Sequence, residues 1–215
     1  LADDRRVTEI QKEFIDSGKT CILVSSNNST FKNAVKTALK NVLKDKIERH
    51  KAKSMTATYK VLVLGVPNTG KSTLINMLAG VRKATTGNIA GVTRVNQWIK
   101  IDDMFMLLDT PGVLWPKFDD GLSRNLAYVG SLSDKEFDMV DLGFELMQVL
   151  YEKYPNIIKE RYDVDFEFEE FIELYDKICL KRGFIMRGNE IDYERAGRTF
   201  ITEFRNGKFG KITLE

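Results

Sequence analysis

The segment that most restricts how this chain can fold is G-V-P-N-T-G-K-S, residues 65–72. Its spacing of glycine, lysine and serine matches a phosphate-binding loop. An apolar strand is expected over residues 59–64, and a helix is expected to begin with the loop's last residues. Such a loop curls its backbone N–H groups toward phosphate oxygens at the positive end of the helix. The alternative, a glycine turn without a ligand, does not require this strand and helix.

A second motif, D-T-P-G, follows another apolar strand expected over residues 105–108. Asp109 can hold Mg²⁺ through water, and the N–H group of Gly112 can bind a γ-phosphate. Thr93, between the two motifs, could place its hydroxyl on Mg²⁺ in the triphosphate state. Lys71 supplies charge to the outer phosphates and Ser72 a hydroxyl to Mg²⁺. This order favours a GTPase over a P-loop ATPase or a small-molecule kinase.

The guanine-reading tetrapeptide [NT]-K-x-D is absent from residues 113–215. Residues 20–24 nevertheless read as a short buried strand, and the polar turn after it, with Ser25 and Ser26, resembles the base-contacting loop of a GTPase. This strand precedes the phosphate loop, so we expect a circular permutation in which the late motifs come first. The chain begins at Leu1 without a methionine, and we expect the tetrapeptide to lie upstream of it.

Helical spacing dominates the second half of the chain. We predict a GTPase domain over residues 1–135. Its first part (1–50) holds the strand and helices that come last in an unpermuted GTPase, and it is followed by a basic linker (51–58) and by the phosphate loop with its switches (59–135). A helical domain is predicted over 136–215. The expected helices include residues 30–49, an amphipathic helix from about 140 that Pro155 ends, and a last helix over 193–205. The fold class is therefore α/β, a permuted P-loop GTPase fold with a small helical domain.

Composition excludes several classes of protein. With 43% hydrophobic and 30% charged residues, the chain is neither disordered nor a membrane protein. Cys21 and Cys179 form neither a disulfide framework nor a metal motif. We therefore expect a cytoplasmic protein, a monomer, with no membrane or DNA partner. Charge is uneven, with nine basic and two acidic residues over 32–60 and eight basic against four acidic over 181–211.

Four stretches carry a resemblance to a known family: G-V-P-N-T-G-K-S-T-L-I-N, D-T-P-G-V-L-W-P-K-F (109–118), E-R-Y-D-V-D (160–165) and K-R-G (181–183). They resemble the YlqF/RbgA family of circularly permuted ribosome-assembly GTPases, and the likeness covers essentially the whole chain. It implies GTP hydrolysis during docking on the maturing large ribosomal subunit, with rRNA bound by the helical domain. It also implies GTP or GDP with Mg²⁺ as ligands.

The resemblance assigns roles by position. It implies that phosphates and Mg²⁺ are held by Asn68, Thr69, Gly70, Lys71, Ser72 and Thr73. Thr93 would sense Mg²⁺, Asp109 and Gly112 would monitor the γ-phosphate, and Ser25 and Ser26 would pack beside the guanine. Asn68 also resembles its counterpart in GTPases that use K⁺. Ala90 departs from the proline that the family often has.

Hydrolysis by the free protein should be slow, because Val113 stands where Ras-like enzymes have a water-orienting glutamine. We expect stimulation by the ribosomal partner, by K⁺, or by both. The basic set of residues 181–211, interleaved with Phe200, Phe204 and Phe209, is the better RNA candidate, although these aromatics also fit an ordinary helix core. A lysine stripe at residues 32, 36, 40 and 44 is a second candidate. The rival function is a nucleotide-independent RNA-binding scaffold with a vestigial phosphate loop.

Overall fold

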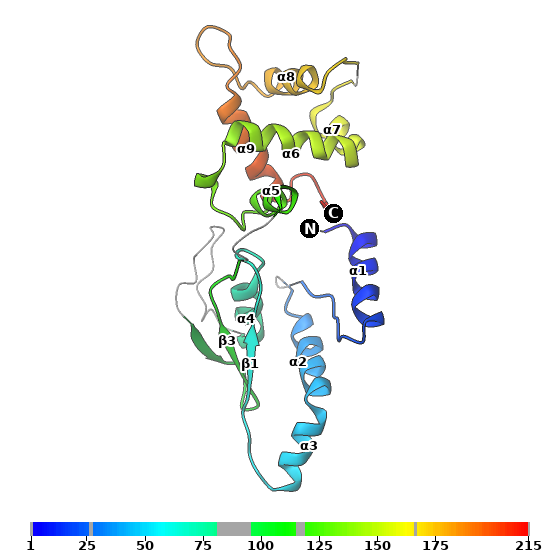
Figure 1. Cartoon of the computed structure of the whole chain (residues 1–215), viewed down its shortest axis with the longest axis vertical. Helices are drawn as coiled ribbons and strands as arrows, with labels where there is room; N and C mark the ends of the chain where they lie inside the picture. The colour runs from blue at the N-terminus through cyan, green and yellow to red at the C-terminus, as the bar shows by residue number, and fades with distance from the viewer. Residues whose placement is uncertain (1, 26–27, 81–95, 115–118, 166, 215) are drawn as a thin grey trace. The chain divides into compact units, whose positions relative to one another are not determined.

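The chain forms two compact units (Figure 1). The sheet unit is Asp4–Pro116, and the helical unit is Lys117–Glu215 together with Leu1–Asp3. The computed structural model describes residues 2–25, 28–80, 96–114, 119–165 and 167–214. Within these residues, no helix combines the length and the apolar character needed to cross a bilayer.

Three strands make the sheet, in the order β1-β3-β2. They are β1 (Tyr59–Val63), β2 (Gln97–Lys100) and β3 (Phe105–Asp109). The central strand β3 runs parallel to β1, with Val63 opposite Asp109, and antiparallel to β2. Because β1 and β3 are parallel neighbours, the loops that leave their carboxyl ends lie side by side. These loops carry the two motifs predicted to hold phosphate.

Helices cover one face of this sheet. The helices of the unit are α1 (Asp4–Asp16), α2 (Phe31–Val42), α3 (Lys44–Ala52) and α4 (Lys71–Ala79). Ile75 and Leu78 of α4 pack with Ile99 and Leu107 of the sheet, and Val35 of α2 joins this core. Side chains on the other face of the strands remain accessible: Leu62 is 52% exposed and Trp98 is 43% exposed.

Two expectations for the sheet unit were wrong. Residues 20–24, predicted to be a buried strand, form no strand, and Ile22 and Leu23 are 40% and 43% exposed. The apolar run has no strand beside it within the described chain, so it gains no ladder of hydrogen bonds. The helix predicted over residues 30–49 is broken at Leu43, whose ψ of 8° departs from helical geometry and which caps both α2 and α3.

The helical unit contains more helices than the periodicity indicated. Its elements are α5 (Asp120–Tyr128), a short 3₁₀ turn (Asp134–Glu136), α6 (Met139–Lys153), α7 (Pro155–Tyr162), α8 (Phe171–Lys181) and α9 (Tyr193–Arg205). The bounds of α9 agree with the prediction. Pro155 follows the end of α6 as expected, but it also begins α7, because proline fits the first turn of a helix, where its missing N–H is not needed.

The two units meet earlier in the sequence than the predicted boundary near residue 135. The division falls after Pro116. Ala127 and Tyr128 of α5 are 1% and 2% exposed and belong to the same core as Leu146 and Phe200. Burial of α5 against the helical core therefore places residues 120–135 in the helical unit.

Helices α6 and α9 approach so closely that glycine is required on both. A Cβ atom built on Gly143 would lie 2.3 Å from the Cα of Gly197, and one on Gly197 would lie 2.0 Å from the carbonyl oxygen of Met139. Neither position can hold a side chain unless a helix moves. This crossing sets the distance between the two helices that share the centre of the core.

Arg205, in the last turn of α9, fastens α5 to α9. Its guanidinium donates to the carbonyl oxygens of Ala127 and Tyr128 at 2.7 and 3.1 Å. It also forms a two-pronged ion pair with Asp134, at 2.7 and 3.0 Å. The hydrogen bonds from Arg205 lower the pKa of the Asp134 carboxyl group.

This ion pair predicts an acid-dependent loss of stability. Because the pKa of Asp134 is lower in the folded protein, its contribution is present at neutral pH and is lost as the pH falls through that lowered value. Asp134→Asn should therefore lower the midpoint of thermal unfolding at pH 7, and the difference from the parent protein should shrink below about pH 4. Thermal melts at both pH values test this. A difference that does not change with pH would contradict it.

Candidate functional site

The phosphate loop lies between β1 and α4 and has the backbone geometry of an N–H cradle. Gly70 caps the N-terminus of α4 at a φ of +84°. Asn68 also has a positive φ, of +61°. Left-handed residues within such a loop turn successive N–H groups toward one concave side. The predicted loop and its helix, which begins at Lys71, are therefore both present.

Lys71 is held inside its own loop. Its Nζ atom donates to the carbonyl oxygen of Val66 at 2.8 Å, and the hydroxyl of Thr69 donates to the same oxygen at 2.9 Å. Burial lowers the pKa of the Lys71 amine, although the nearby Asp109 carboxylate opposes this shift. A partly desolvated cation beside a helix N-terminus favours an anionic ligand.

Asp109 and Ser72 form the part of the site that fits a divalent cation. The Ser72 hydroxyl donates to Oδ2 of Asp109 at 3.0 Å, which joins the two motifs. Asp109 is 1% exposed, and its Oδ1 atom is buried without a hydrogen-bond partner. An unpartnered carboxylate oxygen beside a hydroxyl suits Mg²⁺, which prefers oxygen ligands. Within the described residues no group of three His, Cys, Asp or Glu could hold a metal, so phosphate and water would supply the other ligands.

Gly112 is pressed against the phosphate loop. A Cβ atom on Gly112 would lie 2.4 Å from the nitrogen of Pro67 and 2.5 Å from its Cα and Cγ. The next residue, Val113, donates its N–H to the carbonyl oxygen of Gly65 at 3.2 Å. The approach requires glycine at position 112, since any Cβ there would collide with Pro67. The glycine predicted to sense the γ-phosphate is thus placed directly by the loop that would hold the other phosphates.

Gly112→Ala should therefore disturb both motifs. We expect a loss of about 1–3 kcal/mol from the unfolding free energy of the sheet unit, because the added methyl group meets backbone atoms that have little room to shift. Chemical denaturation measures this loss. Gly121→Ala is the matched control, since the nearest atom to a Cβ there is 3.6 Å away, and it should not destabilise. Equal stability of both variants would contradict the prediction.

The other predicted site residues divide into three groups. Asn68, Thr69, Gly70 and Thr73 lie in the loop or in the first turn of α4, as expected. Ser25 lies before α2, where its carbonyl oxygen accepts a hydrogen bond from the N–H of Asn28 at 3.0 Å. No described contact joins Ser25 to the loop. Ser26 and Thr93 lie outside the described residues.

Sequence reasoning missed two residues that hold the site together. Pro67 is buried against Gly112. Thr110 is 7% exposed, and its hydroxyl donates to the carbonyl oxygen of Val63 at 2.7 Å, which ties the D-T-P-G motif to the end of β1. Pro67 and Thr110 both lie within the two motifs, and this was the only sequence signal that could have pointed to them. A motif does not show which neighbouring residue a side chain will contact.

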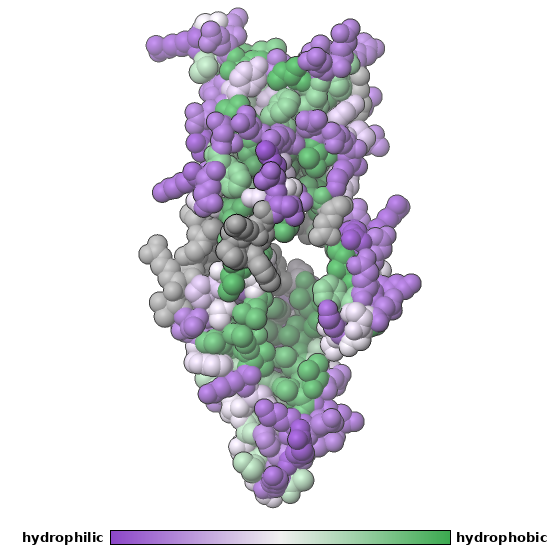
Figure 2. Space-filling model, in the orientation of Figure 1, coloured by the Kyte–Doolittle hydropathy of each residue, from purple (hydrophilic) through white to green (hydrophobic). Residues whose placement is uncertain are grey.

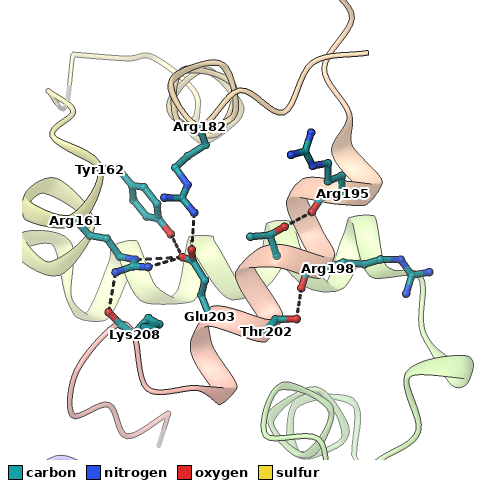
Figure 3. A network of polar contacts seen from close by, with 9 residues as sticks. Arg161, Tyr162, Arg182, Arg195, Arg198, Thr202, Glu203 and Lys208 are labelled. Atoms are coloured by element: carbon teal, nitrogen blue, oxygen red, sulfur yellow. Dashed lines mark hydrogen bonds and ion pairs between the residues drawn. The ribbon is translucent and has the colours of Figure 1, made fainter. Parts of the chain in front are cut away.

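The aromatic residues of the C-terminal RNA candidate belong to the core. Phe200 and Phe209 are 0% and 2% exposed, and Phe204 packs on the same cluster. Many cations of that set also have partners. Figure 3 shows Glu203, which accepts from Arg182 at 2.6 Å and from Arg161 at 2.7 Å. Lys181 pairs with Asp163, Arg198 with Glu194, and Arg205 with Asp134.

Comparison with known proteins adds independent observations. The model of a family described as "50S ribosome-binding GTPase" matches residues 60–177. The chain is 38% identical to Ribosome biogenesis GTPase A of Bacillus pumilus over 100% of its own length and 77% of that protein. It is 31% identical to Ribosome biogenesis GTPase A of Thermotoga maritima, covering 100% of this chain and 72% of that protein.

Solved structures give the same picture. A GDP-bound YlqF matches with a TM-score of 0.68 and 27% identity, covering 100% of this chain and 78% of that one. A GNP-bound YlqF from T. maritima matches with a TM-score of 0.63 and 27% identity, covering 100% and 76%.

Proposed function

Because this chain belongs to the YlqF/RbgA family of ribosome biogenesis GTPases, we propose that it is a GTP-driven switch that docks on the maturing large ribosomal subunit and leaves after hydrolysis. The predicted fold class and GTPase activity are confirmed by this membership. The permuted order of motifs also fits the family. The observation that carries the proposal is the contact of the phosphate loop with the D-T-P-G motif, at Gly112 and between Ser72 and Asp109.

The phosphate loop would bind the nucleotide through the N–H groups of residues 68–73, with Lys71 on the outer phosphates. To do so, the Lys71 amine leaves the carbonyl oxygen of Val66 and turns to the phosphate oxygens. The exchange is favourable because the amine gives up a neutral acceptor for a charged one. The structures of the neighbours contain GDP and GNP, which supports a guanine nucleotide as the ligand.

Ser72 and Asp109 would hold Mg²⁺, with Thr93 as a further ligand in the triphosphate state. When bound, Mg²⁺ neutralises charge on the β- and γ-phosphates. The N–H of Gly112 would meet the γ-phosphate, so its position would differ between GTP and GDP. K⁺ beside Asn68 would add positive charge to the same region. Val113 is 55% exposed and apolar, so it cannot orient the attacking water, and hydrolysis would depend on the partner.

The ribosomal partner is supported by the names of the relatives, and rRNA is the polyanion that the basic residues would meet. In the helical unit, Arg187 and Lys208 are exposed cations without an ion pair to any described residue. They are the candidates for RNA contact there. We expect the protein to act in the cytoplasm, where the proposed ribosomal partner would mature, and we expect it to be a monomer.

The test is sedimentation with immature large ribosomal subunits in the presence of GDP or of a non-hydrolysable GTP analogue. We expect co-sedimentation with the analogue, little with GDP, and faster GTP hydrolysis when the particles are added. Binding that is equal in all nucleotide states, with no hydrolysis, would support the rival scaffold instead. Omission of K⁺ in a parallel series tests its role.

A further inference from the structure

Exposed cations without a carboxylate partner are concentrated at one end of the sheet unit, in the last turn of α2, on α3 and at its C-cap. We call them the α3 cation surface: Lys40, Lys44, Lys46, Arg49, Lys51 and Lys53. All of these residues are exposed, and the same stretch contains only Asp45 and Glu48 as acids. Within the described chain, none of the six forms an ion pair.

Several cations elsewhere in the described chain are paired with carboxylates. Lys36, which belongs to the same lysine stripe in the sequence, lies 2.5 Å from Asp102 at the β2–β3 turn. Arg6 of α1 pairs with Glu9 and Glu13. The structure therefore divides the sequence stripe: Lys36 has a role within the fold, and the cations that follow it are left without counter-charges.

The α3 cation surface is attached to the sheet at a fixed point. The Nδ1 atom of His50 lies 3.1 Å from the hydroxyl oxygen of Tyr59, and the two rings stack with centroids 5.7 Å apart. Tyr59 is 6% exposed at the start of β1. Lys46, Arg49 and Lys53 lie on one side of α3, because positions i, i+3 and i+7 fall on one face of a helix, and all three residues are exposed.

The helix dipole explains only part of this arrangement. Cations in the last turn of α3, such as Arg49 and Lys51, gain about 0.3–1 kcal/mol each from the negative end of the helix. Lys40 gains in the same way from the last turn of α2, but Lys44 and Lys46 lie in the first turn of α3, where the dipole disfavours a cation. Six like charges in one small area also repel one another, and this repulsion is relieved by a bound polyanion.

We propose that the α3 cation surface binds the phosphate backbone of RNA, without reading its sequence, as a contact separate from the helical unit. Lysine is depleted in protein–protein interfaces, whereas lysine and arginine neutralise phosphates and release their counterions. In Figure 2, hydrophilic side chains cover this lower end of the view. The choice of RNA rests on the proposed ribosomal partner, but the contact itself requires no nucleotide.

The experiment compares two variants of the full chain with equal loss of charge. The first is Lys46→Gln/Arg49→Gln/Lys53→Gln, which removes one side of the surface. The control is Lys12→Gln/Lys19→Gln/Lys60→Gln, on exposed lysines of the same unit that form no ion pair with a described residue. Affinity for a fluorescent RNA duplex of about 20 base pairs, without nucleotide, is measured between about 50 and 200 mM KCl.

For the first variant we expect affinity at the lowest salt to fall at least ~10-fold, and the slope of log K against log salt to become shallower by about 2, since each lost phosphate contact contributes roughly 0.7–0.9. The control variant should retain most of the parent affinity and most of the parent dependence on salt. Equal losses of affinity in the two variants would show that RNA responds only to the net charge of the protein. Unchanged RNA binding by the first variant would show that the α3 cation surface does not bind RNA. Either result would overturn the proposal. Tighter binding of polyglutamate than of RNA would assign the surface to an acidic protein and overturn the proposal.

Binding of a fluorescent GTP analogue by the free protein separates this inference from the proposed function. None of the substituted residues belongs to the nucleotide site, so both variants should bind the analogue with the parent affinity. If the parent protein binds RNA as expected but does not bind the analogue, the switch fails and the RNA surface stands. If the analogue binds normally and RNA binding is unaffected by the first variant, the RNA surface fails and the switch stands.

Discussion

Gly197→Ala is expected to destabilise the helical unit by more than about 3 kcal/mol, the largest loss expected from an added methyl group at any glycine that the structure describes. The new Cβ would lie 2.0 Å from the carbonyl oxygen of Met139 and 3.0 Å from its carbonyl carbon. These are backbone atoms inside α6, so a rotamer change cannot relieve the collision. Helix α9 would have to move away from α6, which would loosen the buried contacts of Leu146 and Phe200.

Urea denaturation followed by far-ultraviolet circular dichroism measures this loss. Thr202→Ala is the control on the same helix, because Thr202 is exposed and alanine favours helix more strongly than threonine. The control should be as stable as the parent protein or slightly more stable. If Gly197→Ala keeps the parent midpoint, the close crossing of α6 and α9 is not formed in solution.

The second large effect concerns activity. Lys71→Ala should reduce GTP hydrolysis at least ~100-fold, as the loss of one positioned donor to a developing charge commonly does. It should also weaken binding of GTP in the presence of Mg²⁺. The fold should not suffer, because burial lowers the pKa of the Lys71 amine, which means that the charged amine is less favourable in the folded chain than in water.

Hydrolysis assays and thermal melts of the nucleotide-free protein separate these two effects. Lys60→Ala is the matched control, since Lys60 lies on the strand that leads into the loop, is exposed, and sits over the ring of Trp98. It should keep its hydrolysis rate. A Lys71→Ala protein that hydrolyses GTP within a few-fold of the parent rate would show that the loop is not the catalytic phosphate site.

The sequence predicted correctly those helices and loops whose formation depends on residues close together in the chain. The bounds of α9 follow from apolar residues at helical spacing and from the Asn206-Gly207 stop, and the phosphate loop follows from its glycines and the helix behind it. The strand expected over residues 20–24 does not form, because strand formation depends on a partner that is distant in the sequence. An apolar run becomes a strand only when another strand pairs with it, and no periodicity shows whether that partner is present.

The candidate site shows the same limit. The residues of the loop and of D-T-P-G were predictable from chemistry, because phosphate and Mg²⁺ require particular donors at particular spacings. The contact of Pro67 with Gly112 was not predictable, since it depends on β1 and β3 being neighbours. The same limit applies to the charged residues. The sequence located the basic stretches, but only the structure shows that Lys36 and Arg205 form ion pairs while the cations of α3 do not.

Glu203 has a consequence for how the protein is made. This carboxylate on α9 accepts hydrogen bonds from Arg161 and Tyr162 of α7 and from Arg182 at the end of α8 (Figure 3). The residues that gather around it are translated first, and the acceptor is translated after all of them. The hydrogen bonds of two arginines and a buried tyrosine to this common acceptor can therefore form only after α9 has left the ribosomal exit tunnel, although α7 and α8 can already contact α6.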